Sequence, residues 1–485
     1  MIQLYSPLGG GDEMSYITPA QKDWIRMIYG EDSYEEVLDM FGRLVEQVVL
    51  PAEKNTEIQR AKNPCKVYKE KFHEEEENIK GSLRDICGNE NNGKLPDEVY
   101  GLMEKTLDVI GKEIKQEEGI PDEVYKQIEE NGLPGVPFSE DLGGMELPYP
   151  VYIALLETLG KASPSVGVRY AISNTCAEGL RFNFHDGTLS KYAETILRSL
   201  VAGEKLAAFG LTEPSAAGSN IMQEMATRAV LDEDKKHYVL NGNKMFITNA
   251  GSADVFAIFA KTSDDPRHGI SLFLIEKETK GFSVGQILET RVVENSSLGE
   301  LVLNEVKVPL ENLVGKEGEG IQYAVRMLNS GRVTIAALAV GLAQRAFEEY
   351  LEIAVEGKKF ADKHLDEYDR TKAQLAEMSM EINAARDMTY RAAWLKERFD
   401  SDPQNPERLR EYVIQGNGAK LKASLVAQKA CDYFVKIGGA SSVVKETFSI
   451  KYYLDAFLYY FGEAVPEVLE NTIAGMETKR FKMRK

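Results

Sequence analysis

One carboxylate near the C-terminal end of the chain is surrounded by apolar residues. Glu463 lies in the segment FLYYFGEAVP, where aromatic and aliphatic residues precede and follow it. Burial disfavours the charged form of a carboxyl group and raises its pKa, so a glutamate in these surroundings could serve as a general base near neutral pH. The alternative is an acid just ahead of a helix that begins at Pro466, with Gly462 supplying the turn.

A second candidate site is the segment AFGLTEPSAAGSN, residues 208–220. It stands where the helical pattern gives way to strands, and it combines hydroxyl residues with small side chains and glycine. Backbone N–H groups in such a loop can approach an anionic ligand closely. Taken alone, the segment is more typical of a serine- and glycine-rich connection.

The motifs that are missing exclude several kinds of site. The chain has no G-x-G-x-x-G, no G-x-x-x-x-G-K-[ST] and no G-x-S-x-G motif, which argues against a Rossmann dinucleotide site, a P-loop and a serine hydrolase. The four cysteines and five histidines are scattered without a metal-ligand spacing, so we expect no structural metal and a reducing compartment.

Composition narrows the possible partners and location. The chain has 485 residues, 43% of them hydrophobic, and a formal net charge of −19 at pH 7. An acidic excess opposes binding to nucleic acid or to an anionic membrane surface. The N-terminus lacks a signal-peptide pattern, and no apolar stretch is long enough to span a bilayer. The prediction is a cytoplasmic protein without membrane insertion.

These candidate residues must be positioned by three kinds of structure, and we predict a multi-domain α+β fold. After an extension at 1–33, an N-terminal helical domain should cover 34–205, with an acidic helical insertion at about 60–118. Short apolar runs predict an antiparallel β domain at 206–318. Long three-to-four periodicity predicts a C-terminal bundle of long helices, about 25 to 30 residues each, at 319–485.

Local signals support this division. A helix should follow Pro121 and stop at Asn131-Gly132, and a largely apolar helix at about 149–161 should be buried. In the β region, turns are expected between the apolar runs, the first of them as a type I′ hairpin. The turn pairs are Asn241-Gly242, Asp265-Pro266 and Lys280-Gly281.

Four segments together resemble the acyl-CoA dehydrogenase family of flavoproteins. Their order, their spacing and the helical, β, helical layout agree with that family from about residue 120 to the C-terminus. A weaker match at 41–54, FGRLVEQVVLPAEK, resembles the first helix of the family, whereas 1–33 and about 60–118 lie outside the resemblance. The four segments are the 208–220 loop, LNGNKMFITNAGSAD (240–254), VKVPLENLVGKEGEG (306–320) and SGRVTIAALAVGLAQRAFE (330–348).

The resemblance implies a cofactor, a reaction and partners. In the family, FAD lies between the β domain and the C-terminal bundle. A base takes a proton from the α-carbon of an acyl-CoA, flavin N5 accepts a hydride from the β-carbon, and a trans-2-enoyl-CoA is left. The resemblance also implies a homotetramer that passes electrons to an electron-transfer flavoprotein.

Four residues on the β-domain side are then expected to hold FAD. Thr212 would hydrogen-bond the pyrimidine edge of the flavin, and Ser219 would bind the FAD phosphate. Thr248 would lie near flavin N5, and Phe246 takes the place of a tryptophan that commonly covers the ring. Without the resemblance, the same residues are typical of a turn, a helix cap, a strand and an ordinary core.

The resemblance places the catalytic base at Glu463, through an alignment of residues 455–475 with the family's Y-E-G-T segment. A minority of the family carry the base on the long helix, just before the arginine that matches Arg332. That position here is Gly331, which favours Glu463. Arg332 would bind backbone near the base and hold its loop; a surface arginine is the alternative.

Further cofactor contacts are expected from the bundle. Gly438 and Gly439 retain a glycine pair that in the family lets backbone approach the adenine half of a neighbouring subunit's cofactor, and Phe360 is also expected to bind cofactor. Gly357, however, stands where the family has an arginine that reaches a neighbour's FAD. The other departures are Asn220 for an aspartate, Gly462 for an aromatic residue and Val465 for a threonine.

One residue bears on the substrate. Arg169 matches an arginine that the glutaryl-CoA dehydrogenase branch uses to bind the distal carboxylate of its substrate. A buried arginine needs a charged partner, and a dicarboxylic acyl-CoA would provide one. The alternative is that Arg169 pairs with an acid of the protein or points to solvent.

Two other functions remain open at this point. A flavin oxidase or monooxygenase could use the same fold, and would consume oxygen during turnover. A non-catalytic relative serving in assembly or as a scaffold would account for the altered cofactor contacts, and would fail to bind FAD.

Overall fold

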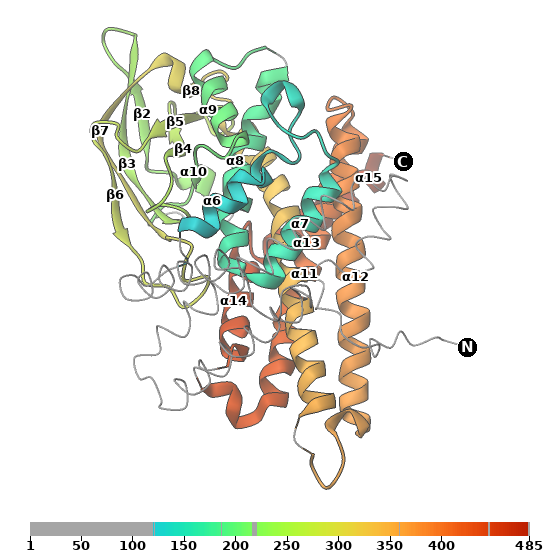
Figure 1. Ribbon diagram of the computed structural model, residues 1–485. Helices are drawn as coiled ribbons and strands as arrows, with labels where there is room; N and C mark the ends of the chain where they lie inside the picture. The colour runs from blue at the N-terminus through green and yellow to red at the C-terminus, as the bar shows by residue number, and fades with distance from the viewer. Residues whose placement is uncertain are drawn as a thin grey trace, which may run out of the picture.

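The structure is a computed structural model, and Figure 1 shows its helices and strands. The extension at 1–33, the match at 41–54 and the acidic insertion all lie outside the residues that it describes, as does Ser219. The described residues are 120, 122–185, 187–215, 221–357, 359–444 and 447–483.

Four helices of the N-terminal region precede the sheet. The helix expected after Pro121 is present and ends before Asn131-Gly132, as predicted, with Gly132 at a φ of 76°. Every residue of the apolar helix α7 is buried, which confirms that prediction. The four helices are α6 (Asp122–Glu130), α7 (Tyr149–Ala162), α8 (Pro164–His185) and α9 (Lys191–Val201).

An eight-stranded sheet follows, in the order β6-β7-β3-β2-β4-β5-β8, with β1 paired to β4. Most neighbouring strands are antiparallel, which confirms the predicted antiparallel β domain, although β1 and β2 both pair with β4 in the parallel sense. The strands are β1 (Ala207–Gly210), β2 (Arg228–Leu231), β3 (His237–Ile247), β4 (Val255–Lys261), β5 (Ile270–Glu276), β6 (Phe282–Ile287), β7 (Gly299–Pro309) and β8 (Leu313–Val314), and the short helix α10 (Ile221–Glu224) lies between β1 and β2.

The predicted hairpin at Asn241-Gly242 is wrong, because both residues lie inside β3. The register against β7 shifts between Leu240 and Gly242, which is a β-bulge. A side chain at Gly242 would come within 2.5 Å of the Thr227 hydroxyl, so this glycine permits close approach of the chain before β2. The two other turn pairs do lie between strands, as predicted.

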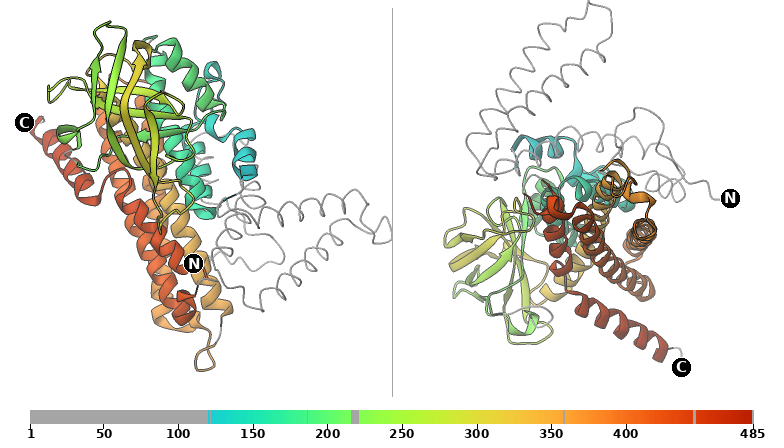
Figure 2. Two further views of the ribbon diagram at one scale, coloured as in Figure 1. Left: turned by 90° about the vertical axis from the view of Figure 1, so that its left-hand side faces the viewer. Right: turned by 90° about the horizontal axis from the view of Figure 1, so that it is seen from below.

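Long helices form the C-terminal bundle, and three of them exceed the predicted length. Figures 1 and 2 show the sheet on one side of this bundle, with α15 extending away from it. No helix in the described ranges is long and apolar enough to cross a membrane. The bundle contains α11 (Gly320–Glu356), α12 (Asp369–Asp400), α13 (Pro406–Gly438), α14 (Ser449–Phe461) and α15 (Pro466–Met483).

The buried helix α7 packs directly against the backbone of α11. A Cβ atom on Gly341 of α11 would overlap the carbonyl oxygen of Glu157, and one on Gly160 of α7 would overlap the backbone of Leu338. Two glycines therefore let the N-terminal helices and the bundle approach to backbone contact, which fixes α11 relative to the rest of the molecule.

Gly341→Ala should lower the free energy of unfolding by about 2–3 kcal/mol, because the added methyl group forces two buried helices apart. Urea unfolding measures the change. Gly475→Ala on α15 is the matched control, since its Cβ would meet no atom within 4 Å; it should be neutral or stabilise by up to about 1 kcal/mol. Equal stability of the two variants would contradict the close contact.

Candidate active site

The loop between α14 and α15 carries Glu463 in an unusual backbone conformation. Glu463 has a φ of 58° and Ala464 a φ of 113°. A residue other than glycine in such a region costs on the order of 1–3 kcal/mol, and the conformation persists only where its surroundings impose it. The contacts that hold this loop therefore decide where the Glu463 side chain points.

Two cations from neighbouring helices make those contacts. Arg332 of α11 donates from Nε to the carbonyl oxygen of Glu463, at 3.1 Å. Lys420 of α13 donates from Nζ to the carbonyl oxygens of Tyr460, at 2.9 Å, and Ala464, at 2.6 Å. The loop is thus bound on both sides of Glu463 and at Glu463 itself.

Glu463 is half-buried as a residue, but one oxygen of its carboxyl group is enclosed in a position that suits a base. Its Oε2 atom is buried and has no hydrogen-bond partner among the described residues. Burial raises the pKa of this carboxyl group to about 7, although the charges of Arg332 and Lys420 oppose the rise. Near neutral pH the group can therefore both accept and release a proton.

The carboxyl group of Glu463 fills the space beside Gly331. A Cβ atom on Gly331 would lie only 2.6 Å from Glu463 Cδ. A glycine at the position before Arg332 therefore makes room for a carboxyl group that arrives from another part of the chain. The two places considered for a base in the sequence coincide in space.

Three of the residues expected to hold the cofactor meet at one end of β3. The backbone N–H of Met245 donates to the carbonyl oxygen of Thr212 at 3.0 Å, which places the 212 loop beside this strand. Phe246 is 58% exposed, with a φ of 58°, and Thr248 follows the strand directly and is half-buried. The end of β3 thus offers an exposed aromatic ring between two threonines.

A buried ion pair fastens the 212 loop to β3. Lys244 Nζ lies 2.7 Å from Glu213 Oε1, and neither side chain is more than 1% exposed. Glu213 also accepts hydrogen bonds from the backbone of Ala226 and Thr227. Burial lowers the pKa of Lys244 to about 8, although the charge and the hydrogen bond of Glu213 raise it. The pair holds Thr212 and Phe246 next to each other.

Helix α8 connects the two groups of residues. The side-chain amide of Asn249, the residue after Thr248, donates to the carbonyl oxygens of Arg169 on α8 and Ala207 on β1, both at 3.0 Å. Two turns further along α8, about 10 Å along its axis, Cys176 is buried, and both burial and the charge of Glu463 raise the pKa of its thiol. The end of β3 near Thr248 and the Glu463 carboxyl group therefore both lie beside helix α8.

The guanidinium group of Arg169 lies 4.1 Å above the ring of Tyr125. Its Nε atom is buried and has no partner among the described residues. Burial raises the pKa of the nearby Glu129 carboxyl group, and the Tyr170 hydroxyl and the charge of Arg169 oppose that rise. An acid of the protein thus lies within electrostatic reach of Arg169, but part of the guanidinium group is still unpartnered.

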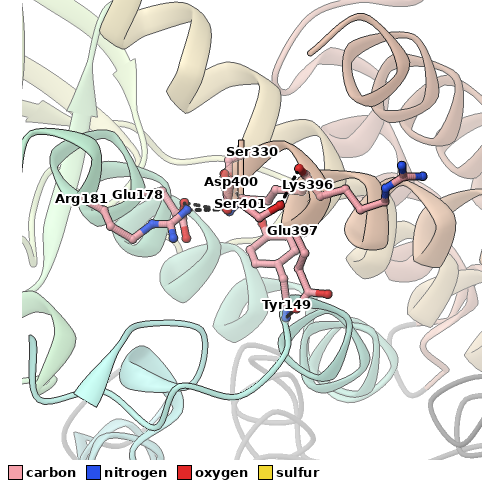
Figure 3. A network of polar contacts seen from close by, with 9 residues as sticks. Tyr149, Glu178, Arg181, Ser330, Lys396, Glu397, Asp400 and Ser401 are labelled. Carbon is pink, nitrogen blue, oxygen red and sulfur yellow. Dashed lines mark hydrogen bonds and ion pairs between the residues drawn. The ribbon is translucent and has the colours of Figure 1, made fainter. Parts of the chain in front are cut away.

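A cavity of about 350 Å³ opens between α8, α11, α12 and α13. Asn329 and Ser330 line it, so it reaches the residues immediately before Gly331. Figure 3 shows a charged cluster along this cavity, in which Glu178 lies 2.9 Å from Lys396 and Arg181 bridges to Asp400.

The carboxylates of the charged cluster are only partly satisfied by the described residues. Two of its carboxyl oxygens, Glu178 Oε1 and Asp400 Oδ1, are buried without a partner in the described part of the chain. Both acids line the cavity.

Comparison with known proteins gives three family matches along the chain. The acyl-CoA dehydrogenase N-terminal, middle and C-terminal domain families match residues 89–188, 208–306 and 318–476. A short-chain-specific acyl-CoA dehydrogenase of Clostridium acetobutylicum is 36% identical over 379 residues, which covers 78% of this chain and 95% of that protein. The chain belongs to the acyl-CoA dehydrogenase family.

Two solved structures of similar proteins agree with this assignment. Butyryl-CoA dehydrogenase from Megasphaera elsdenii is 31% identical, with a TM-score of 0.68 over 74% of this chain and 90% of that one. A glutaryl-CoA dehydrogenase in complex with glutaryl-CoA is 29% identical, with a TM-score of 0.66 over 73% and 86%. The N-terminal match begins at residue 89, so the resemblance starts earlier in the chain than expected.

This acyl-CoA dehydrogenase uses FAD, as the FAD complexes among its structural neighbours indicate. The described residues fit that cofactor, because Phe246 presents an exposed ring and the half-buried threonines at 212 and 248 lie on the neighbouring backbone. When bound, FAD accepts the two electrons that leave the substrate. No cluster of three potential metal ligands occurs in the described ranges.

The remaining predicted cofactor residues of the dehydrogenase lie elsewhere in the chain. Phe360 is 68% exposed in the connection between α11 and α12, where its ring packs on Tyr368. Gly438 ends α13, and Gly439 follows it with a φ of 58°. Figure 1 shows the α11–α12 connection at the lower end of the bundle, away from the sheet. The role of these residues in binding the cofactor stays a prediction.

Several residues of the site escaped the sequence analysis. Lys420, Cys176 and the cluster around Glu178 carry no recognisable motif, and their partners lie far away in the sequence. The Lys244 and Glu213 pair lies within two quoted segments, but nothing in their spacing indicates an ion pair. Only the fold brings these side chains together.

Lys244→Met should lower the free energy of unfolding by about 3–5 kcal/mol, because it leaves the Glu213 charge buried without a partner. Urea unfolding gives the change, and FAD content shows whether the 212 loop is displaced. Adding Glu213→Gln should recover part of the loss, since no charge then stays buried.

Lys307→Met is the control for this ion pair. Lys307 pairs with Asp232 on the surface of the sheet, so its loss should scarcely change stability. If both lysine variants unfold like the wild type, the buried pair does not hold the loop.

Proposed function

We propose that this enzyme oxidises a short-chain acyl-CoA to the trans-2-enoyl-CoA, with Glu463 as the base that removes the α-proton. The observation that carries the proposal is the buried, unpartnered Oε2 of Glu463, on a carboxyl group whose pKa is raised to about 7. The short chain is supported by the names of relatives, which include a short-chain-specific enzyme and a butyryl-CoA dehydrogenase.

The chemistry explains why the base is built in this way. A C–H bond next to a thioester is only weakly acidic, so the base must be desolvated, correctly aimed and unprotonated at the working pH. Burial beside Gly331 desolvates the carboxyl group, and the hydrogen bond from Arg332 fixes its backbone. The proton from the α-carbon would come to rest on a Glu463 carboxyl oxygen.

The cavity beside α11 supports a CoA thioester as the substrate. It reaches Asn329 and Ser330, next to the base, and it is lined by Glu178 and Asp400, each of which has one carboxyl oxygen without a partner in the described part of the chain. The pantetheine arm of CoA carries two amide N–H groups that match such acceptors. The arm would then bring the thioester to Glu463 from the side of α8 and α12.

We propose an electron-transfer flavoprotein as the electron acceptor. A relative 28% identical to this chain is named subunit CarC of the caffeyl-CoA reductase–Etf complex of Acetobacterium woodii. Rapid reoxidation by oxygen with release of peroxide would instead indicate a flavin oxidase. The homotetramer stays a prediction, which sedimentation of the purified protein tests.

Glu463→Gln should bind FAD but reduce it about 10²–10⁴-fold more slowly with an acyl-CoA, since the amide cannot take the α-proton. Stopped-flow bleaching of the flavin measures the rate. In the wild type this rate should rise with pH through about 7, because the pKa of Glu463 is raised to about 7 and only the carboxylate is active.

Glu467→Gln is the matched control, because Glu467 is an exposed acid in the first turn of α15. It should keep the wild-type rate and pH profile. Full activity of Glu463→Gln would show that the base lies elsewhere.

A dicarboxylic acyl-CoA is the second candidate substrate, and Arg169 is the observation that favours it. The buried Nε of Arg169 has no partner in the described ranges, although Glu129 is nearby. A substrate carboxylate could accept from this donor. A relative with known structure is a glutaryl-CoA dehydrogenase in complex with glutaryl-CoA.

Arg169→Ala should lower kcat/KM for glutaryl-CoA by about 10-fold or more relative to butyryl-CoA, because a charge-assisted hydrogen bond is lost. Flavin reduction with both esters gives the ratio. Arg198→Ala on α9 is the control, since Arg198 pairs with Glu194 on the surface. If the ratio of kcat/KM for the two esters is unchanged in Arg169→Ala, Arg169 does not bind a substrate carboxylate, and the monocarboxylic acyl-CoA is the only candidate substrate that remains.

A further inference from the structure

Lys420 occupies a place in α13 that is unusual for a lysine. Its side chain is fully buried, and it points at the loop between α14 and α15. Lysine is rarely buried unless it is paired, because removing an ammonium group from water is costly. Its hydrogen bonds go to two backbone carbonyl oxygens, those of Tyr460 and Ala464, at 2.9 and 2.6 Å.

We propose that Lys420 is a positioning residue for the base, because its ammonium group ties Tyr460 to Ala464 and so fixes the direction of the Glu463 side chain between them. The inference rests on the proposed function, in which Glu463 removes the α-proton. It assigns a role to a residue that carries no sequence motif and whose hydrogen bonds go to backbone carbonyl oxygens.

The geometry of the loop requires such a contact. Glu463 and Ala464 both have positive φ, a conformation that a chain does not keep without external support. Arg332 binds the carbonyl oxygen of Glu463, but the carbonyl of the next residue is held by Lys420. Without Lys420 the loop can relax toward an ordinary backbone conformation, which would turn the carboxyl group away from Gly331.

The charge of Lys420 acts on Glu463 as well. The groups that face this carboxyl group are Arg332 from α11, Lys420 from α13 and the Cys176 thiol from α8, and Tyr412 of α13 interacts with Arg332. Burial raises the pKa of Glu463, and the positive charges of Arg332 and Lys420 oppose that rise; burial also lowers the pKa of Lys420 to about 7, against the charge of Glu463. Below about pH 7, where Lys420 carries its charge, removing it therefore shifts Glu463 further toward its protonated, inactive form.

Two substitutions separate the hydrogen bonds from the charge. Lys420→Gln retains N–H donors for the carbonyl oxygens but has no charge, whereas Lys420→Met loses both. In the FAD-loaded enzyme, both should move the rise of the flavin-reduction rate to higher pH. Lys420→Met should also lower the high-pH plateau by about 10²-fold.

A direct titration of the carboxyl group gives a readout without substrate. The infrared C=O band of protonated Glu463, assigned by its absence in Glu463→Gln, should lose half its intensity near pH 7 in the wild type. The midpoint should be higher in both Lys420 variants. FAD content and thermal unfolding show whether each variant keeps the fold.

Lys422→Met is the matched control, because Lys422 lies two residues along the same helix and pairs with Glu381 of α12. It should leave the pH profile and the infrared midpoint unchanged. A folded Lys420→Met enzyme with the wild-type plateau and midpoint would overturn the inference. Flavin reduction at full rate by Glu463→Gln would instead refute the proposal that Glu463 is the base. The infrared midpoint of Glu463 in the Lys420 variants would still show whether Lys420 acts on that carboxyl group.

Discussion

The burial of one carboxyl group between the helices of the bundle is the constraint on which the rest of this site depends. A buried carboxylate is costly unless neighbouring groups compensate its charge. Glu463 is only partly compensated: Arg332 and Lys420 are close, yet its Oε2 has no hydrogen-bond partner in the described part of the chain. That incomplete compensation keeps its pKa near the range in which a proton can be taken up and released.

Buried polar contacts elsewhere in the molecule serve to place backbone segments. The pair of Lys244 and Glu213 fastens the 212 loop to β3, and the amide of Asn249 joins the end of that strand to α8 and β1. Such contacts contribute little net stability when they are intact but are costly to break. They hold the 212 loop and the end of β3, where the cofactor is expected, at a fixed place relative to Glu463.

The outline of the fold was accessible from local patterns, because periodicity reports which face of an element is buried. The buried helix α7, the long helices of the bundle and the turns at Asp265-Pro266 and Lys280-Gly281 all follow the pattern. The hairpin prediction at Asn241-Gly242 failed because a β-bulge and a tight turn favour the same residue types. Which of the two forms depends on the neighbouring chain, here at Thr227.

The sequence by itself determined the family, the order of helical and β regions and the candidate acid at Glu463, because these depend on residue types at short spacing. Only the tertiary structure decided that Glu463 fills the space beside Gly331, that Lys420 binds its loop, and that Glu178 and Asp400 share a cavity. These contacts join helices far apart in the chain. Their geometry follows from how the helices pack, and no local pattern of residues records it.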